Sequence, residues 1–205
     1  MNNSENNPDI YYTIEEAKSA EIKIKGSRFI ADVKHVEARS EAETFLDEIR
    51  AKYFDATHHC YAFKIGSHGE VFKFSDDGEP NGSAGKPILF TFDKFGVSDA
   101  VAVVTRYFGG TKLGVGGLVR AYQEASAEAF ALCTKKAVHL TRQVNINCNY
   151  EDINTVKRLL SQYAVSQNET YSDSVSIIAQ IHLSECEKFC EELFRISNGR
   201  LRGTF

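Results

Sequence analysis

The sequence predicts an α+β protein made of two small domains. The chain has 205 residues, which is enough for two domains that each bury a core. Short segments of alternating apolar residues are interleaved with segments whose apolar residues recur at helical spacing. A second such series begins near Ala137. We therefore expect one domain over residues 1–135 and another over 136–205, joined without a long linker at Lys135 and Lys136.

The composition indicates a reduced, cytoplasmic protein. The formal net charge is −4 and the pI is near 5.9, which argues against wholesale coating of nucleic acid but allows a local basic patch. Five scattered cysteines favour free thiols over a disulfide framework. No apolar run is long enough for a membrane span. The polar N-terminus lacks a signal-peptide pattern, and residues 1–10 are expected to be disordered.

In the first domain, residues 20–25 and 28–33 alternate around Gly26 and Ser27, which predicts a hairpin. A helix is expected next, opened by a capping box of Ser40 and Glu43 and running to about Lys52. Strands are expected over 59–65 and 70–75, followed by a loop over 75–87. After the loop we expect a short helix with Pro87 first and Gly96 at its end, and then a strand over 100–105 that is covered on both faces. A helix to about Cys133 follows, with an inner face of Leu118, Ala121, Ala125, Ala129 and Leu132.

The second domain shows the order β-α-β-β-α-β, which is that of a ferredoxin-like domain. Its expected elements are a strand with one parity over Val138–Cys148, a helix over 153–163, strands over 165–171 and 174–183, a helix opened by a capping box of Ser184 and Glu187, and a closing strand over 200–205. We expect this domain to fold by itself.

Residues 106–122, "RYFGGTKLGVGGLVRAY", form the most distinctive stretch. They contain five glycines and three cations but no acid, just before a predicted helix. A helix start offers unpaired N–H groups, and glycines allow close approach, so the stretch could bind phosphate. The candidate residues are Arg106, Gly109, Gly110, Lys112, Gly114, Gly116, Gly117 and Arg120. The alternative is a structural glycine turn, and neither the Walker A nor the dinucleotide spacing is present.

A second loop is acidic. Asp76, Asp77 and Glu79 could hold Mg²⁺ or transfer protons. Ordinary turn chemistry is the favoured interpretation, because Asp-Gly and Pro-Asn-Gly are common turn sequences. His58 to Cys60, and the pair Cys186 and Cys190, lack the partners of a metal site. No nucleophile motif is present either, so a non-enzymatic role is favoured over catalysis.

Three motifs resemble the YigZ/Impact family: "GSRFIA" at 26–31, "FSDDGEPNGSAGKPIL" at 74–89, and "VVTRYFGGTKLGVGGLVRAY" at 103–122. The resemblance implies an N-terminal β-α fold like ribosomal-protein domains and domain IV of elongation factor G, followed by a ferredoxin-like domain similar to its domain V. It also implies roles for the motif residues Asp76, Asp77, Gly78, Glu79, Pro80, Gly85 and Lys86. Eukaryotic relatives regulate translation by competing for a partner that activates a stress kinase, a pathway that this chain is not expected to share.

The favoured function is therefore a binding protein that contacts RNA or ribosome-associated machinery through residues 106–120 and influences translation. One alternative is an enzyme acting on a phosphorylated small molecule or nucleotide, and another is a protein–protein adaptor. Because the acidic and glycine-rich loops flank one predicted sheet, we expect them to converge. We further expect Lys112→Ala to spare the fold, and Gly116→Val to damage both fold and binding if Gly116 has a positive φ or touches the ligand.

Overall fold

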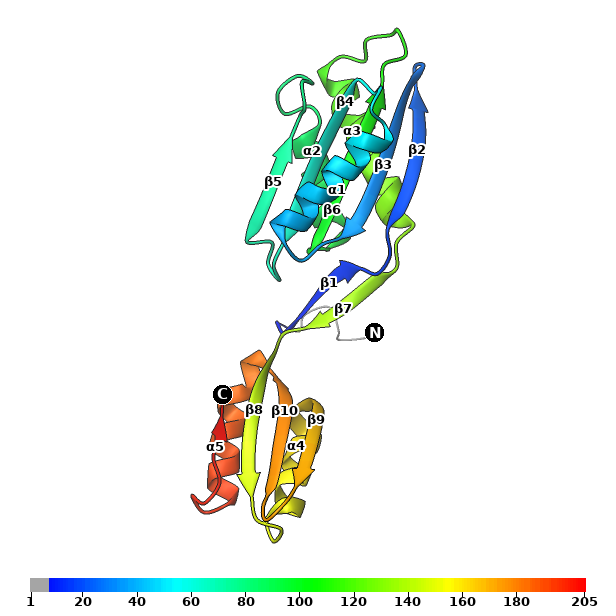
Figure 1. Cartoon of the computed structure of the whole chain (residues 1–205). Helices are drawn as coiled ribbons and strands as arrows, with labels where there is room; N and C mark the ends of the chain where they lie inside the picture. Colours follow the sequence, from blue (N-terminus) through cyan, green and yellow to red (C-terminus); the bar gives the residue numbers. More distant parts are fainter. Residues whose placement is uncertain (1–7) are drawn as a thin grey trace. The chain divides into compact units, whose positions relative to one another are not determined.

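The computed structural model describes residues 8–205, which divide into two units. The first unit is Tyr11–Val138, and the second comprises residues 139–205 together with 8–10. The division lies close to the boundary expected at Lys135 and Lys136. Figure 1 shows the elements of both units along the chain.

A five-stranded antiparallel sheet forms the centre of the first unit. Its strands, in spatial order, are β2 (Lys18–Ile24), β3 (Ser27–His35), β6 (Ala100–Tyr107), β4 (His58–Ile65) and β5 (Val71–Ser75). β6 is the middle strand, and its residues are buried up to Arg106. This confirms the expectation of a strand covered on both faces, which its apolar residues at both parities indicate.

Helices cover both faces of this sheet (Figure 1). α1 (Arg39–Lys52) packs on one face, where Phe45, Leu46 and Ile49 meet the side chains of Phe63 and Val103. The opposite face carries α2 (Gly85–Phe95) and α3 (Val115–Ala131). Their side of the core is built from the following residues, among others: Phe29, Val33, Ala62, Ile88, Phe92, Val104, Leu118, Ala121, Tyr122 and Phe130.

A separate two-stranded sheet pairs β1 (Ile10–Ile14) with β7 (Lys135–His139). The sequence pattern does not predict β1, and it indicates disorder for residues 1–10. Residues 1–7 lie outside the described residues, but for residues 8–10 the expectation is wrong. Asp9 is buried, its carbonyl accepts a hydrogen bond from the Leu140 amide at 2.7 Å, and Ile10 begins β1.

The second unit has the element order β-α-β-β-α-β. Its elements are β8 (Thr141–Cys148), α4 (Ile153–Tyr163), β9 (Ala164–Tyr171), β10 (Val175–His182), α5 (Cys186–Ile196) and β11 (Gly203–Thr204). The sheet order is β11-β8-β10-β9, with antiparallel neighbours. Val175, Ile177, Ala179 and Ile181 alternate into the core beneath the two helices, as their spacing predicts. The strand expected over Val138–Cys148 is instead divided between β7 and β8.

Both expected capping boxes are wrong. α1 begins at Arg39 after Ala38, so Ser40 lies inside the helix, and the Glu41 carboxylate accepts a hydrogen bond from the Glu37 amide at 2.8 Å. α5 begins after Glu185 without a side-chain cap. The Ser184 hydroxyl instead donates to Asp9 at 2.5 Å, in a 3-10 turn that precedes the helix. The Ser184 hydroxyl, which the local pattern predicts to cap the helix, therefore binds Asp9, a residue distant in the sequence.

Two smaller expectations about helix residues also need correction. Pro87 is the third residue of α2 rather than the first. Proline, which has no N–H, is tolerated there as well, because the first four N–H groups of a helix have no partner within the helix. Leu132 follows the end of α3 and is 55 % exposed, whereas Phe130 takes its place in the core. None of the helices within residues 8–205 is both long and apolar enough to cross a membrane.

Candidate nucleic-acid interface

The acidic loop after β5 and the glycine-rich loop after β6 meet at one pocket of about 330 Å³. The expectation that the two loops converge is therefore confirmed. The residues around the pocket are Glu79, Pro80, Arg106, Phe108, Lys112, Leu113, Gly114, Val115 and Leu118. We call this cavity the loop pocket.

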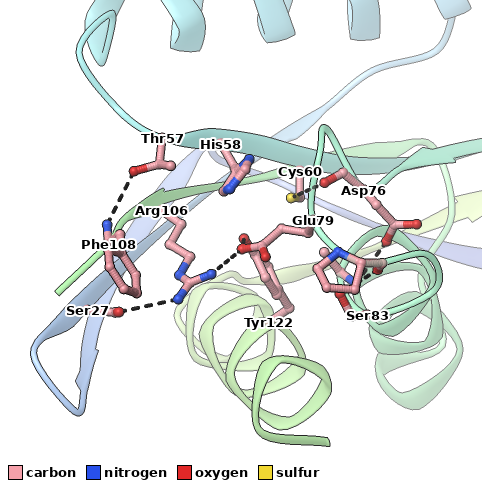
Figure 2. Close-up of polar contacts among 12 residues, drawn as sticks. Ser27, Thr57, His58, Cys60, Asp76, Glu79, Ser83, Arg106, Phe108 and Tyr122 are labelled. Atoms are coloured by element: carbon pink, nitrogen blue, oxygen red, sulfur yellow. Dashed lines mark hydrogen bonds and ion pairs between the residues drawn. The ribbon is translucent and has the colours of Figure 1, made fainter. Parts of the chain in front are cut away.

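A buried ion pair closes one side of the loop pocket. Arg106 Nη1 donates to Glu79 Oε1 at 2.5 Å, and both side chains are more than nine-tenths buried. The Tyr122 hydroxyl donates to the same oxygen at 2.7 Å. Figure 2 shows Arg106, from β6, and Tyr122, from α3, both pointing toward Glu79. Arg106 is thus neutralised inside the protein, so its expected role as an uncompensated cation is wrong.

Burial also controls the acidity of the groups around this pair. Desolvation, with the neighbouring Cys60 and Glu79 adding to it, raises the pKa of Tyr122 far above its ordinary value. Desolvation likewise raises the pKa of the Cys60 thiol. Both groups are therefore uncharged at neutral pH, and the Tyr122 hydroxyl remains a hydrogen-bond donor to the Glu79 carboxylate.

Asp76 is occupied by the start of α2. Its Oδ1 accepts hydrogen bonds from the amides of Ala84 and Gly85 at 2.9 Å, and its Oδ2 accepts one from Gly82 at 2.8 Å. A carboxylate at this position satisfies amides that have no partner within the helix and faces the positive end of the helix dipole. The motif residue Asp76 therefore has a structural role that its place in a turn sequence did not reveal.

Asp77 turns away from the other two acids. Its Oδ2 accepts a hydrogen bond from the His59 amide at 2.6 Å, and its carbonyl lies 2.7 Å from His58 Nδ1. The structure therefore does not bring Asp76, Asp77 and Glu79 together around one point. Within the described part of the chain, no cluster of three or more His, Cys, Asp or Glu residues could hold a metal ion.

The glycines of the two loops serve different purposes. A side chain on Gly109 would collide with Gly26 in the β2–β3 turn, since an added Cβ would lie 1.9 Å from its carbonyl carbon. At Gly85 an added Cβ would lie 2.7 Å from the backbone of Ser75. Gly78, Gly110 and Gly114 have positive φ, as tight turns require. These glycines are required by the fold.

Gly116 and Gly117 are different, because both lie in the first turn of α3. Gly116 has no positive φ, and the nearest atom to an added Cβ is the end of the Arg120 side chain at 4.0 Å. The first condition for backbone strain in Gly116→Val, a positive φ, is therefore not met. At Gly117 an added Cβ would lie 3.1 Å from Leu113. Neither a close neighbour nor a positive φ therefore requires a glycine at position 116.

Two of the three predicted cations remain available on the surface. Lys112 and Arg120 are exposed and form no ion pair with residues 8–205. α3 starts between them after Gly114, without a side-chain cap and without an acid in its first turn. Lys86 is exposed but lies over the Phe90 ring, and it does not line the loop pocket. The surface charge of the motif is therefore concentrated at Lys112, Arg120 and the bare helix start.

Two residues of this site are not predicted by the sequence pattern. Phe108 is 48 % exposed at the loop pocket, and the Arg106 guanidinium lies 5.5 Å from the centre of its ring. Ser27 accepts a hydrogen bond from the Gly109 amide at 3.1 Å and so ties the glycine-rich loop to the first motif. An aromatic residue directly before paired glycines was a signal for Phe108, whereas nothing local indicated the role of Ser27.

The fold and the site define a two-unit protein of mixed helices and strands, with an exposed, glycine-rich loop beside a buried ion pair. Residues 25–130 match the Impact N-terminal domain, and residues 146–200 match a domain of unknown function. The chain belongs to the IMPACT family, which confirms the resemblance drawn from its motifs. It is 36 % identical to IMPACT family member YvyE of Bacillus subtilis over 93 % of this chain and 88 % of that protein. It is also 36 % identical to IMPACT family member YigZ of Escherichia coli, over 87 % and 89 %.

One solved structure has a similar fold over almost the whole chain. A crystal structure of a hypothetical protein matches 95 % of this chain and 96 % of its own, with 32 % identity and a TM-score of 0.66. A structure described as the two-domain translational regulator Yih1 matches 58 % of this chain and 46 % of its own. That match has 25 % identity and a TM-score of 0.34, which is too low to establish a shared fold.

Proposed function

We propose that this chain is a cytoplasmic, non-enzymatic protein that influences translation by binding RNA through residues 108–120. The observation that carries the proposal is the pair of exposed cations, Lys112 and Arg120, on either side of an uncapped helix start. Backbone amides and cations together suit the phosphates of a nucleic acid. Gly116 supports it, because the fold has no need of a glycine there.

The two units are consistent with a role in translation. We infer that the second unit is ferredoxin-like, since its order β11-β8-β10-β9 places the first and third strands in the centre. The first unit is taken as similar to ribosomal-protein domains and domain IV of elongation factor G, as the family resemblance implies. Fold alone does not fix function, so the proposal rests on the exposed loop rather than on these similarities.

The test is binding of a labelled single-stranded RNA across a series of salt concentrations. The wild-type affinity is expected to fall steeply with salt, and Lys112→Ala is expected to reduce the slope by about one. Lys94→Ala is the matched control, because Lys94 is an exposed lysine at the end of α2, outside the loop. Melting curves of all three proteins should coincide.

Other results would select the other functions. Tight binding of a phosphorylated small molecule with little salt dependence would favour an enzyme, although Asp76, Asp77 and Glu79 do not converge. Absence of any RNA binding at low salt would favour a protein–protein adaptor. Equal salt slopes for the wild type and for Lys112→Ala would overturn the assignment of the site to this loop.

A further inference from the structure

We infer that the loop pocket receives a single unpaired base of the RNA, with Phe108 as its stacking surface and Glu79 Oε2 as its hydrogen-bond acceptor. This inference rests on the proposed function and names the part of the RNA that enters the site. Proteins that read single-stranded RNA bind splayed bases by stacking them on aromatic side chains and by hydrogen bonds to their edges.

The polar side of the loop pocket has unused hydrogen-bonding capacity. Glu79 Oε1 takes the hydrogen bonds from both Arg106 and Tyr122, while Oε2 accepts none from the described part of the chain. Arg106 Nε is buried and also has no partner there. Buried polar groups are usually satisfied, so an unpartnered donor beside a carboxylate oxygen that accepts no hydrogen bond indicates a binding site for a polar group. Both side chains line the pocket.

The apolar side of the loop pocket suits a flat ring. Phe108 and Val115 both line the loop pocket, and their side chains are 48 % and 55 % exposed. Arg106 holds the Phe108 ring at the pocket through a cation–π contact of 5.5 Å. Exposed aromatic residues beside a cation are the usual elements of a stacking site for bases.

The size and the surroundings also fit one nucleotide. A volume of about 330 Å³ lies at the small end of ligand sites, which suits one base better than a large cofactor. Gly114 and Val115 belong both to the pocket lining and to the start of α3. A base in the pocket would therefore carry its phosphate to the uncapped amides and to Lys112. The pocket and the helix start thus match the two ends of the same nucleotide.

The carboxylate gives the site a preference among bases. A carboxylate attracts N–H donors and repels the acceptors beside them. Guanine is the base whose Watson–Crick edge presents two neighbouring N–H donors, whereas adenine, cytosine and uracil each place acceptors beside their donor. We therefore expect guanine to be preferred at one position of the bound strand, by readout of its Watson–Crick edge.

The experiment compares Phe108→Ala with Phe90→Ala in the full chain. Phe90 is the matched control, because it is 52 % exposed in the same unit but does not line the loop pocket. The probes are uridine octamers that carry guanine, adenine or an abasic site at one central position. Phe108→Ala should weaken binding of the guanine octamer about tenfold. Phe90→Ala should not, and the abasic octamer should bind the wild type about as weakly as Phe108→Ala binds the guanine octamer.

Each alternative result has a distinct meaning. If Lys112→Ala lowers the salt slope while Phe108→Ala and Phe90→Ala bind alike, the base pocket is wrong and the RNA-binding function stands. If no octamer binds, both proposals fall. If guanosine monophosphate binds as tightly as the guanine octamer, the site serves a free nucleotide and not an RNA strand. Loss of guanine preference in Glu79→Gln, with its melting curve checked, would support the acceptor role of Glu79; an unchanged preference would overturn it.

Discussion

At the scale of single residues, the pair of Arg106 and Glu79 changes the meaning of the glycine-rich motif. In sequence, Arg106 is one of three cations without a neighbouring acid. In the fold, Glu79 neutralises it at 2.5 Å and Tyr122 completes the network. A buried pair of this kind needs both partners, because removing one leaves an uncompensated charge. The motif therefore contributes an internal framework as well as a surface.

The two classes of glycine lead to a matched prediction. Gly109→Ala should destabilise the protein by about 2 kcal/mol or more, because its Cβ would meet the Gly26 backbone at 1.9 Å. Gly116→Ala should leave stability unchanged or raise it by up to about 1 kcal/mol, since alanine favours a helix. Urea unfolding of both variants measures the difference. Equal stabilities would mean that the turn at Gly26 yields to the added methyl group.

RNA binding by Gly116→Ala tests whether Gly116 serves binding rather than stability. Gly116→Ala should weaken binding while keeping a wild-type melting curve, if close backbone approach is the reason for that glycine. Wild-type affinity in Gly116→Ala would remove Gly116 from the site and leave Lys112 and Arg120 as its polar contacts.

At the scale of elements, the acidic loop holds the start of α2 in place. Three backbone amides donate to Asp76, so this one side chain acts as the helix cap that serine or asparagine often provides. Because α2 supplies Ile88 and Phe92 to the core, a disordered first turn would also loosen the packing beneath it. The conformation of the loop and the position of the helix are therefore coupled.

Asp76→Ala should lower the free energy of unfolding by about 1–2 kcal/mol, because it leaves amides of the first turn without partners. Asp47→Ala is the control, since Asp47 is an exposed acid on α1 whose ion pair with Arg50 spans 3.6 Å at the surface. That variant should change stability by less than about 0.5 kcal/mol. A loss in Asp76→Ala no larger than in the control would show that water satisfies the amides equally well.

At the scale of the whole molecule, the reactivity of the cysteine thiols can measure the unfolding of each unit separately. Burial raises the pKa of all five thiols, in the case of Cys133 to about 11. Since the thiolate is the reactive form, the folded chain should react slowly with thiol reagents at pH 8. Cys60 and Cys133 belong to the first unit, and the other three belong to the second.

Labelling at increasing urea concentrations should therefore show two groups. Cys60 and Cys133 are expected to become reactive together, and Cys148, Cys186 and Cys190 together, as each unit unfolds. At pH 8 the unfolded chains should be labelled much faster than the folded ones, because the folded pKa values lie above the ordinary thiol value of about 9 and the reactive thiolate fraction is therefore smaller. Mass spectrometry of each cysteine peptide gives the midpoints. Rapid labelling of Cys60 without urea would contradict the buried position of β4.

The α+β class, most strands and helices, and the motifs of the IMPACT family can be predicted from the sequence alone. These depend on local properties: the alternation of residues 175–181 and the apolar run of β6 are visible in any short window. The pairing of β1 with β7, the cap by Asp76 and the neutralisation of Arg106 were decided only in three dimensions. Glu79 and Arg106 are 27 positions apart, and a single sequence does not reveal which distant charges or strands will meet. Because Arg106 is buried against Glu79, Lys112 and Arg120 are the exposed cations of the loop, and local composition does not reveal this difference.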